Sequence, residues 1–299
     1  MKTPIKKQID DLFSCYDTTG TPGLALSVID HGKMVYSRGY GMASLEHGVP
    51  IRPDTVFDIG STSKQFVAFC AALLELKGKL SLEDDIRKFL PEMTRYEFPV
   101  KVRHLIFHTS GIRDYLALMW LAGMRFENDY PDSEIFGLVS RQKRLNFRPG
   151  TEFLYSNSGY LLLGEIIKRV SGKTLAVFAE ENIFRPLEMK NTHFHDDFSR
   201  IVKNKASGYS VLDGTIKTDI SLFDAVGDGG VNTTVEDLTK WDRNFYCNIL
   251  GGGPALINKV TEPGRLDDGR QLEYAWGLFV AQYRGAKLIA HGGAWVGYR

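Results

Sequence analysis

The sequence predicts an α+β fold in which strands from both ends of the chain form one antiparallel sheet, flanked by helices. Two observations indicate this. Strand-like segments at 24–29 and 34–40 lie near the N-terminus, and a second pair at 274–282 and 287–290 lies near the C-terminus. Between them, from about 102 to 185, apolar residues recur mainly at helical spacing.

This pattern predicts a single domain over residues 1–299. Its sheet part covers about 1–60 and 265–299, and its mainly helical part covers about 61–264. No internal repeat, low-complexity tract or linker-like stretch divides the chain. A chain of 299 residues is long enough to bury a large core.

Individual helices are predicted from spacing and from their end residues. Apolar residues after Pro4 give an amphipathic helix that reaches Phe13, and the uniformly apolar run 66–74 predicts a helix buried on every side. Ser81–Asp84 resembles a capping box that opens a short helix. Two later helices are expected, at the positions 159–170, stopped by Gly172, and after Thr234 toward Tyr246.

The composition excludes several classes of function. The 37 basic and 36 acidic side chains nearly balance, which gives no electrostatic case for binding nucleic acid or an anionic membrane. Cys15, Cys70 and Cys247 have no pairing pattern typical of disulfides or zinc sites. The chain has neither an apolar signal core nor a membrane-spanning segment. We therefore expect a cytoplasmic protein, or an exported one whose signal peptide has been removed.

Ser61-Thr62-Ser63-Lys64 is the most informative stretch, because the buried helix follows it directly. Lys64 lies one turn after Ser61 and on the same face, so a hydroxyl and an amine meet at a dry helix end. The alternative is a helix cap with a lysine that reaches to solvent. The similar motif Ser140–Lys143 lies among charged residues without a buried helix and is ascribed to chance.

A lysine can act as a general base near neutral pH only when its pKa is lowered by roughly 2–3 units from ~10.4. Burial against the apolar helix lowers the pKa, and the positive end of the helix dipole adds about 0.3–1 kcal/mol in the same direction. Lys64 is placed where both effects act.

A second group of candidate residues is Tyr155-Ser156-Asn157, in a loop that follows Pro149-Gly150. Such a loop can present a phenol and an amide to a cleft. The phenol could relay the serine proton to a leaving group, and the amide could hold a substrate carbonyl and the lysine. The alternative for Tyr155 is packing alone.

A third group is His291-Gly292-Gly293, at the end of the strand 287–290. The two glycines allow a substrate to lie against the strand backbone. A backbone N–H there could stabilise an oxyanion together with the N–H of Ser61. A structural histidine at a strand end is the alternative for His291.

In this order, Ser61-x-x-Lys64, Tyr155-x-Asn157 and His291-x-Gly293 resemble the motifs of the serine β-lactamase and penicillin-recognising hydrolase superfamily. The branch that includes class C β-lactamases, DD-peptidases, D-amino-acid amidases and esterases is the most similar. The resemblance covers nearly the whole chain. Further segments look like landmarks of this family: Phe107–Ile112, Phe147–Gly150, Pro186–Met189 and Gly229–Thr234.

The resemblance implies a cofactor-free serine hydrolase without a metal that acts through an acyl-enzyme. Ser61 would be the nucleophile, Lys64 and Tyr155 the general base and acid pair, and Asn157 a substrate contact. The N–H groups of Ser61 and Ala294 would form the oxyanion hole, with His291 and Gly293 beside the substrate. Small carboxylic esters, or peptides and amides with D-residues, would be the substrates.

Three departures from the family pattern bear on this. Family β-lactamases usually carry Lys-Thr-Gly where this chain has His291-Gly292-Gly293, which weakens recognition of a substrate carboxylate. Glu188 replaces a glycine of many relatives. Similar proteins also continue with a further strand and a helix, whereas this chain ends at Arg299, so we expect its C-terminal end to be truncated.

Other candidates receive structural interpretations. His108 is expected to be a turn residue, and His193 and His195 to lie in a polar surface turn without a metal. Aromatic residues of the middle region could line an acyl pocket or belong to the core: Tyr115, Trp120, Phe126, Tyr130 and Phe136.

Two rival functions remain. One is a β-lactamase or a penicillin-binding sensor that acylates without turnover. The other is an interaction protein with a free sheet edge beside His291. The substrate itself and the oligomeric state do not follow from the sequence.

Overall fold

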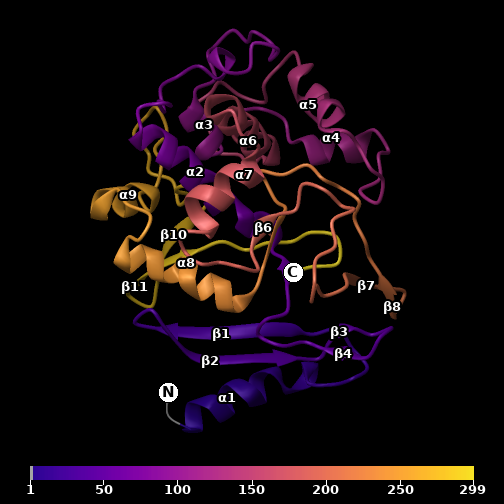
Figure 1. The fold of residues 1–299 in the computed structure, drawn as a ribbon. Coiled ribbons are helices and arrows are strands. Elements are labelled where there is room, and N and C mark those ends of the chain that lie inside the picture. Colours follow the sequence, from indigo (N-terminus) through magenta and orange to yellow (C-terminus); the bar gives the residue numbers. More distant parts are fainter. Residues whose placement is uncertain (1–2) are drawn as a thin grey trace.

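The computed structural model describes residues 3–299, with most helices in the middle of the chain and hairpins near its ends (Figure 1). Helix α1 (Thr3–Phe13) packs on the hairpin of β1 (Leu24–Asp30) and β2 (Lys33–Tyr40). Asp10 of α1 joins the two elements, because its carboxylate accepts a hydrogen bond from Arg38 at 2.7 Å. The predicted first helix and first pair of strands are confirmed.

Helix α2 (Lys64–Leu76) forms the centre of the core and follows a 3-10 turn at Gly60–Ser63. Its residues 66–74 are at most 5% exposed, which confirms the predicted buried helix. Helix α6 (Asn157–Ser171) packs beside α2. Gly172 ends α6 in the left-handed conformation, with φ +71°, as the sequence predicts for this glycine.

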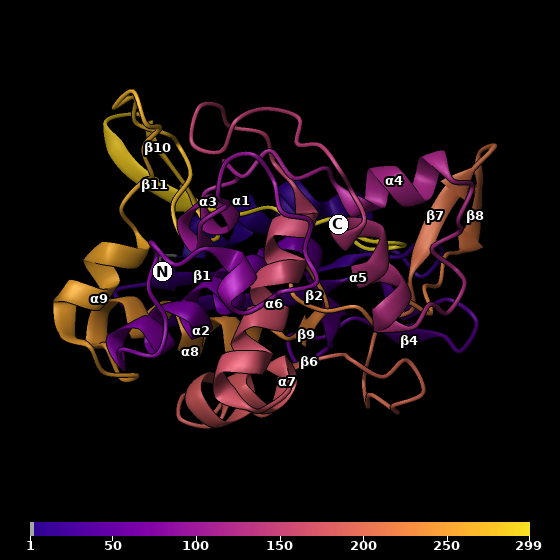
Figure 2. The same ribbon diagram turned by 90° about the horizontal axis from the view of Figure 1, so that it is seen from above.

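Further helices surround this pair, and Figure 2 shows how they lie around α2 and α6. They are α3 (Val102–Ile106), α4 (Tyr115–Leu121), α5 (Asp132–Ser140), α7 (Leu175–Ala179) with a π turn at Glu180–Phe184, α8 (Val235–Cys247) and α9 (Gly253–Val260). Thr234 caps α8 by accepting a hydrogen bond from the Asp237 N–H at 3.1 Å, as predicted.

Two small strand pairs lie at the periphery: β3 (Met42–Ser44) with β4 (Val49–Pro50), and β7 (Tyr209–Leu212) with β8 (Thr215–Thr218). A three-stranded antiparallel sheet has the order β5 (Phe57–Asp58), β9 (Val231–Thr233), β6 (His193–Phe194). Asp58 pairs with Asn232 in this sheet. The pairing holds the segment before β9 against the segment that leads into α2, far away in the sequence.

The α+β class is confirmed, but the expected joining of the two chain ends in one sheet was wrong for residues 3–299. The C-terminal strands β10 (Phe279–Tyr283) and β11 (Ala286–Ala290) pair only with each other, as β1 and β2 do. A groove of about 600 Å³ separates β1 from the C-terminal residues, so no ladder of hydrogen bonds connects them. Its walls include Leu24 and Gly293.

The helix predicted after Ser81 is reduced to a 3-10 turn, Ile86–Lys88. The cap forms in part, since the Ser81 N–H donates to Asp84 at 3.0 Å. The N–H of Ile86 donates instead to the backbone carbonyl of Val100, at 2.9 Å. Pairing with this distant segment replaces the intrahelical bonds that a longer helix needs.

None of the helices described between residues 3 and 299 has both the length and the apolar character needed to cross a membrane.

The packing of α2 predicts the cost of a cavity. Phe66 is fully buried against Phe184 and Trp241, with ring centroids 5.5 and 4.6 Å away. We expect Phe66→Ala to lower the free energy of unfolding by about 3–5 kcal/mol in urea titration. Tyr246→Ala is the control, because that side chain is 73% exposed, and it should change stability by less than about 0.5 kcal/mol. Equal effects of the two substitutions would contradict this packing.

Candidate active site

The Lys64 amine lies at the centre of a hydrogen-bonded group. Its Nζ is 3.0 Å from the Ser61 hydroxyl, 2.9 Å from the Asn157 side-chain oxygen and 2.6 Å from the backbone carbonyl of Asp228. The three partners come from the turn before α2, the start of α6 and the segment before β9. Lys64 itself is fully buried. The structure therefore brings the predicted serine and lysine into direct contact.

Burial lowers the pKa of Lys64 to about 8, while the charges of Asp228 and Asp114 act in the opposite direction. At pH 7 a group with this pKa is neutral in about one molecule in ten. The neutral amine can accept the Ser61 proton across the 3.0 Å contact. The shift is of the size that a lysine base requires.

The Tyr155 hydroxyl is buried and makes no hydrogen bond of good geometry within residues 3–299. Its ring lies under the lysine, with Nζ 5.0 Å from the ring centroid. Burial raises the pKa of Tyr155, and the neighbouring Ser61 hydroxyl lowers it only in part. The phenol is thus neutral at pH 7 and can donate its proton.

His108 supports the Tyr155 ring from behind. The two rings lie 4.2 Å apart between centroids, and His108 Nδ1 accepts a hydrogen bond from the Ser156 N–H at 3.1 Å. Burial holds the pKa of His108 well below its usual value. His108 has a positive φ of 56°, consistent with the turn position predicted from the sequence.

Asn157 is fixed at the first position of α6. Its N–H donates to a carboxylate oxygen of Asp114 at 2.5 Å, and the other oxygen of Asp114 caps α4 through the Ala117 N–H at 3.1 Å. Because one carboxylate holds both helix starts, the Asn157 side chain faces Lys64. The sequence reasoning did not identify Asp114.

The segment 291–294 passes close to the turn before α2. A methyl group on Gly293 would lie 1.9 Å from the carbonyl oxygen of Ile59, and one on Gly60 would lie 2.7 Å from the Ala294 nitrogen. Only glycines allow this approach. The Ala294 N–H forms no hydrogen bond within residues 3–299 and lies beside the start of the Ser61 turn. The Ala294 N–H is therefore free to donate to an oxyanion.

The His291 ring lies beside this segment but is occupied by other contacts. Its Nδ1 is 2.6 Å from the Gly292 carbonyl and its Nε2 is 3.0 Å from the Tyr274 hydroxyl. The carbonyl can only accept, so Nδ1 carries the proton and Nε2 accepts from Tyr274. Burial lowers the pKa of His291 to about 4. No positive charge stands at this position at neutral pH.

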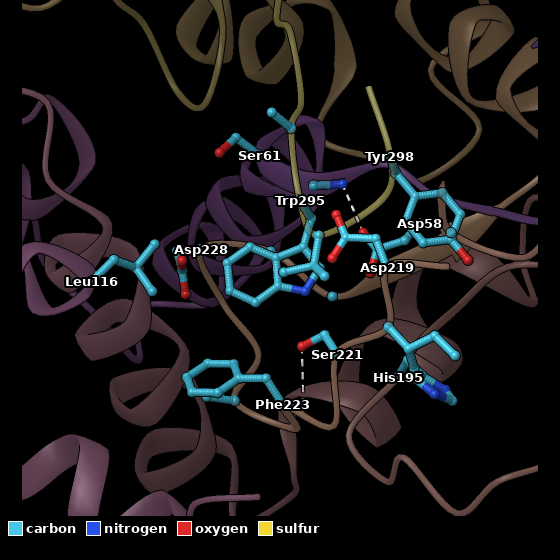
Figure 3. Close-up of a pocket in the computed structure, with 18 of the residues that line it drawn as sticks. Asp58, Ser61, Leu116, His195, Asp219, Ser221, Phe223, Asp228, Trp295 and Tyr298 are labelled. Carbon is cyan, nitrogen blue, oxygen red and sulfur yellow. Dashed lines mark hydrogen bonds between the residues drawn. The ribbon is translucent and has the colours of Figure 1, made fainter. Parts of the chain in front are cut away.

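A pocket of about 390 Å³ opens beside the serine, as Figure 3 shows. Four of the predicted site residues line it: Ser61, Tyr155, Asn157 and Ala294. Lys64 lies beneath the wall, and His291 and Gly293 lie outside the lining.

Two further lining residues are Tyr115 and Asp228. The sequence left Tyr115 undecided between pocket and core, and the structure places it in both, because it is 1% exposed within the core and borders the pocket. By contrast, Trp120 is 73% exposed. Asp228 was missed, although it directly precedes the glycine pair of the landmark Gly229–Thr234. Its position before Gly-Gly was the available signal.

His193 in β6 lies close to His195, the residue that follows this strand. His193 Nε2 is 3.4 Å from His195 Nδ1. Burial lowers the pKa of each to about 4. Among residues 3–299, no group of three His, Cys, Asp or Glu side chains is arranged to hold a metal ion.

A family model described as Beta-lactamase matches residues 9–299. The chain belongs to the Beta-lactamase family. This match confirms the resemblance inferred from the three motifs.

The D-aminopeptidases of Brucella anthropi and Gluconobacter oxydans are 30% identical over 281 residues and 29% identical over 280 residues. In both comparisons 93% of this chain is covered. The chain spans about half the length of these curated relatives, 52% in each case.

Among solved structures, an octameric penicillin-binding protein homologue from Pyrococcus abyssi superimposes with a TM-score of 0.83 at 27% identity, covering 98% of this chain and 68% of that one. The D-amino acid amidase of Ochrobactrum anthropi SV3 superimposes with a TM-score of 0.78 at 23% identity, covering 98% and 85%. The second likeness shows the fold alone.

The two glycines after His291 provide a matched test of the site geometry. Gly293→Ala would place a methyl group against the Ile59 carbonyl, whereas a methyl group on Gly292 meets nothing within 4 Å. We expect Gly293→Ala to slow fluorophosphonate labelling of Ser61 by about 100-fold, the usual cost of losing an oxyanion donor. Gly292→Ala should label at the wild-type rate. Equal rates for both variants would contradict the placement of Ala294.

The pKa of Lys64 predicts the pH dependence of the same labelling reaction. Because the neutral amine is the base, the rate should fall about tenfold per pH unit below about 8 and level off above it. Mass spectrometry of the intact protein across a pH series measures this, with Ser61→Ala as the blank. A labelling rate that does not change between about pH 6 and about pH 8 would exclude Lys64 as the base.

Proposed function

We propose that this protein hydrolyses amide or ester bonds through an acyl-enzyme on Ser61, with amides and peptides that carry D-residues as its favoured substrates. The contact between the buried Lys64 amine and the Ser61 hydroxyl, at 3.0 Å, carries the proposal. A neutral amine at this distance is the arrangement that activates a serine. The names of the D-aminopeptidase relatives favour the amide substrates.

In the first half of the reaction, neutral Lys64 accepts the Ser61 proton while the serine oxygen attacks the substrate carbonyl. The N–H groups of Ser61 and Ala294 stabilise the oxyanion. The proton then passes through the Tyr155 hydroxyl to the leaving nitrogen or oxygen. The bond to the leaving group breaks, and an ester between the acyl group and Ser61 remains.

In the second half, a water molecule attacks the acyl-enzyme. Lys64 or Tyr155 accepts a proton from this water, and the Ser61 oxygen takes one back as the ester bond breaks. The carboxylic acid leaves and the serine is restored. Neither step needs a group beyond the residues of the site.

The neutral His291 favours this assignment over a β-lactamase. Penicillins carry a carboxylate, and a charged hydrogen bond from a lysine would recognise it. With a pKa of about 4, His291 supplies no such charge at neutral pH. We therefore expect no efficient turnover of penicillins.

A substrate panel tests the proposal: D-alanine p-nitroanilide, p-nitrophenyl acetate and nitrocefin, each with the wild type and Ser61→Ala. We expect steady turnover of the anilide or the ester and little of nitrocefin. Ser61→Ala should lower turnover by at least about 10⁴-fold, as for other catalytic nucleophiles.

Three results would contradict the proposal. A burst with nitrocefin followed by no turnover would indicate a penicillin sensor. Activity of the Ser61→Ala variant equal to that of the wild type would exclude Ser61 as the nucleophile. Absence of a fluorophosphonate mass shift on the folded protein would exclude serine chemistry altogether.

A further inference from the structure

Asp228 presents a buried carboxylate to the pocket beside the serine. The residue is 6% exposed and lines the same cavity as Ser61. Both carboxylate oxygens accept from a single donor, the Tyr115 hydroxyl, at 3.1 Å. Within residues 3–299, the one further donor that reaches them is the backbone N–H of Asp228 itself. Because an ionised carboxylate has about four acceptor sites, part of this capacity is unused.

The Lys64 amine, the nearest cation, does not occupy the free acceptor sites of the Asp228 carboxylate. An ammonium group has three N–H donors, and those of Lys64 point to the Ser61 hydroxyl, the Asn157 side chain and the backbone carbonyl of Asp228. None remains for the Asp228 carboxylate. The Lys64 charge stabilises the ionised Asp228 carboxylate without donating a hydrogen bond to it, so a cation that enters the pocket and donates to it would be bound favourably.

The surroundings of this carboxylate suit a cation. In the view of Figure 3, Asp228 lies between the side chains of Leu116 and Trp295, while Asp58 and Asp219 lie on the other side of Trp295. The Phe223 ring stacks on Tyr115 at 6.1 Å and lies 5.7 Å from Trp295. Aromatic faces beside a carboxylate add attraction for an ammonium group.

The position relative to the nucleophile limits which amine can bind. Lys64 Nζ contacts both the Ser61 hydroxyl, at 3.0 Å, and the main chain of Asp228, at 2.6 Å. Ser61 and Asp228 also line one pocket, so a substrate carbonyl attacked by Ser61 lies near Asp228. An α-amine is separated from its carbonyl carbon by two covalent bonds only, so it fits this short span.

We propose that the Asp228 carboxylate binds the ammonium group of the substrate, so that the site selects amides and short peptides whose first residue has a free α-amine. The inference rests on the proposed function, since the amine belongs to the molecule that Ser61 attacks. Burial raises the pKa of Asp228 to about 6, which leaves it mainly ionised at pH 7. N-acylated substrates lack the cation and should be poor.

The test compares D-phenylalanine p-nitroanilide with its N-acetyl form on the wild type and on Asp228→Asn. We expect the wild type to prefer the free amine in kcat/KM. Asp228→Asn should lower the ratio of the two kcat/KM values by about 10- to 100-fold, the range of a hydrogen bond to a charged group. Equal loss on both substrates would overturn the inference and indicate that Asp228 acts through Lys64 instead.

Asp219→Asn is the matched control, because it removes the same charge from the other side of Trp295. For Asp219→Asn, the ratio of the two kcat/KM values should stay within about threefold of the wild-type ratio. A carboxylate that does not contact the substrate ammonium contributes little to binding through solvent. A fall as large as that of Asp228→Asn would show a general effect of negative charge and overturn the assignment to Asp228.

A second measurement uses the wild type alone and remains decisive if Asp228→Asn does not fold. Benzylamine and the neutral benzyl alcohol are compared as protectants of Ser61 against fluorophosphonate labelling. We expect the cation to protect at a concentration at least about tenfold lower. Equal protection would overturn the inference while leaving the proposed function intact, whereas absence of any labelling would overturn the proposed function itself.

Discussion

The site depends on the three hydrogen bonds of one buried amine. Lys64 Nζ holds the turn before α2, the first residue of α6 and the segment before β9 at distances of 2.6–3.0 Å. These acceptors offset the cost of taking the amine out of water, and the remaining penalty lowers its pKa to about 8. The same burial therefore serves both cohesion and reactivity. Loss of any one acceptor would affect both.

Much of this could be predicted from the sequence, for identifiable reasons. The run 66–74 is apolar at every position, so the helix and its burial follow without knowledge of its neighbours. Its N-terminal end then places Ser61 and Lys64 on one face. The loop with Tyr155 and Asn157 and the glycines after His291 were found as motifs, and the structure brings them to the same place.

Other features depend on distant partners and leave no local pattern. Asp228 supplies a backbone carbonyl to Lys64, which any residue type could do, so its place before the glycine pair marks the segment but its identity gave no indication of this contact. Alternation of residues identifies a strand but not the strand beside it. The sequence pattern therefore did not show that the hairpins at the two ends of the chain remain separate. The turn at Ile86 likewise follows from its bond to Val100 rather than from Ser81.

The candidate site contains residues from four segments: the start of α2, the loop before α6, the approach to β9 and the residues after β11. Ser61 and Ala294 lie 233 positions apart in the sequence and meet only through the contact at Gly60. A molecule in which a single segment has not docked has no complete reaction centre. A covalent serine reagent thus counts correctly assembled molecules, and the labelled share of a preparation measures its quality independently of any assay of turnover.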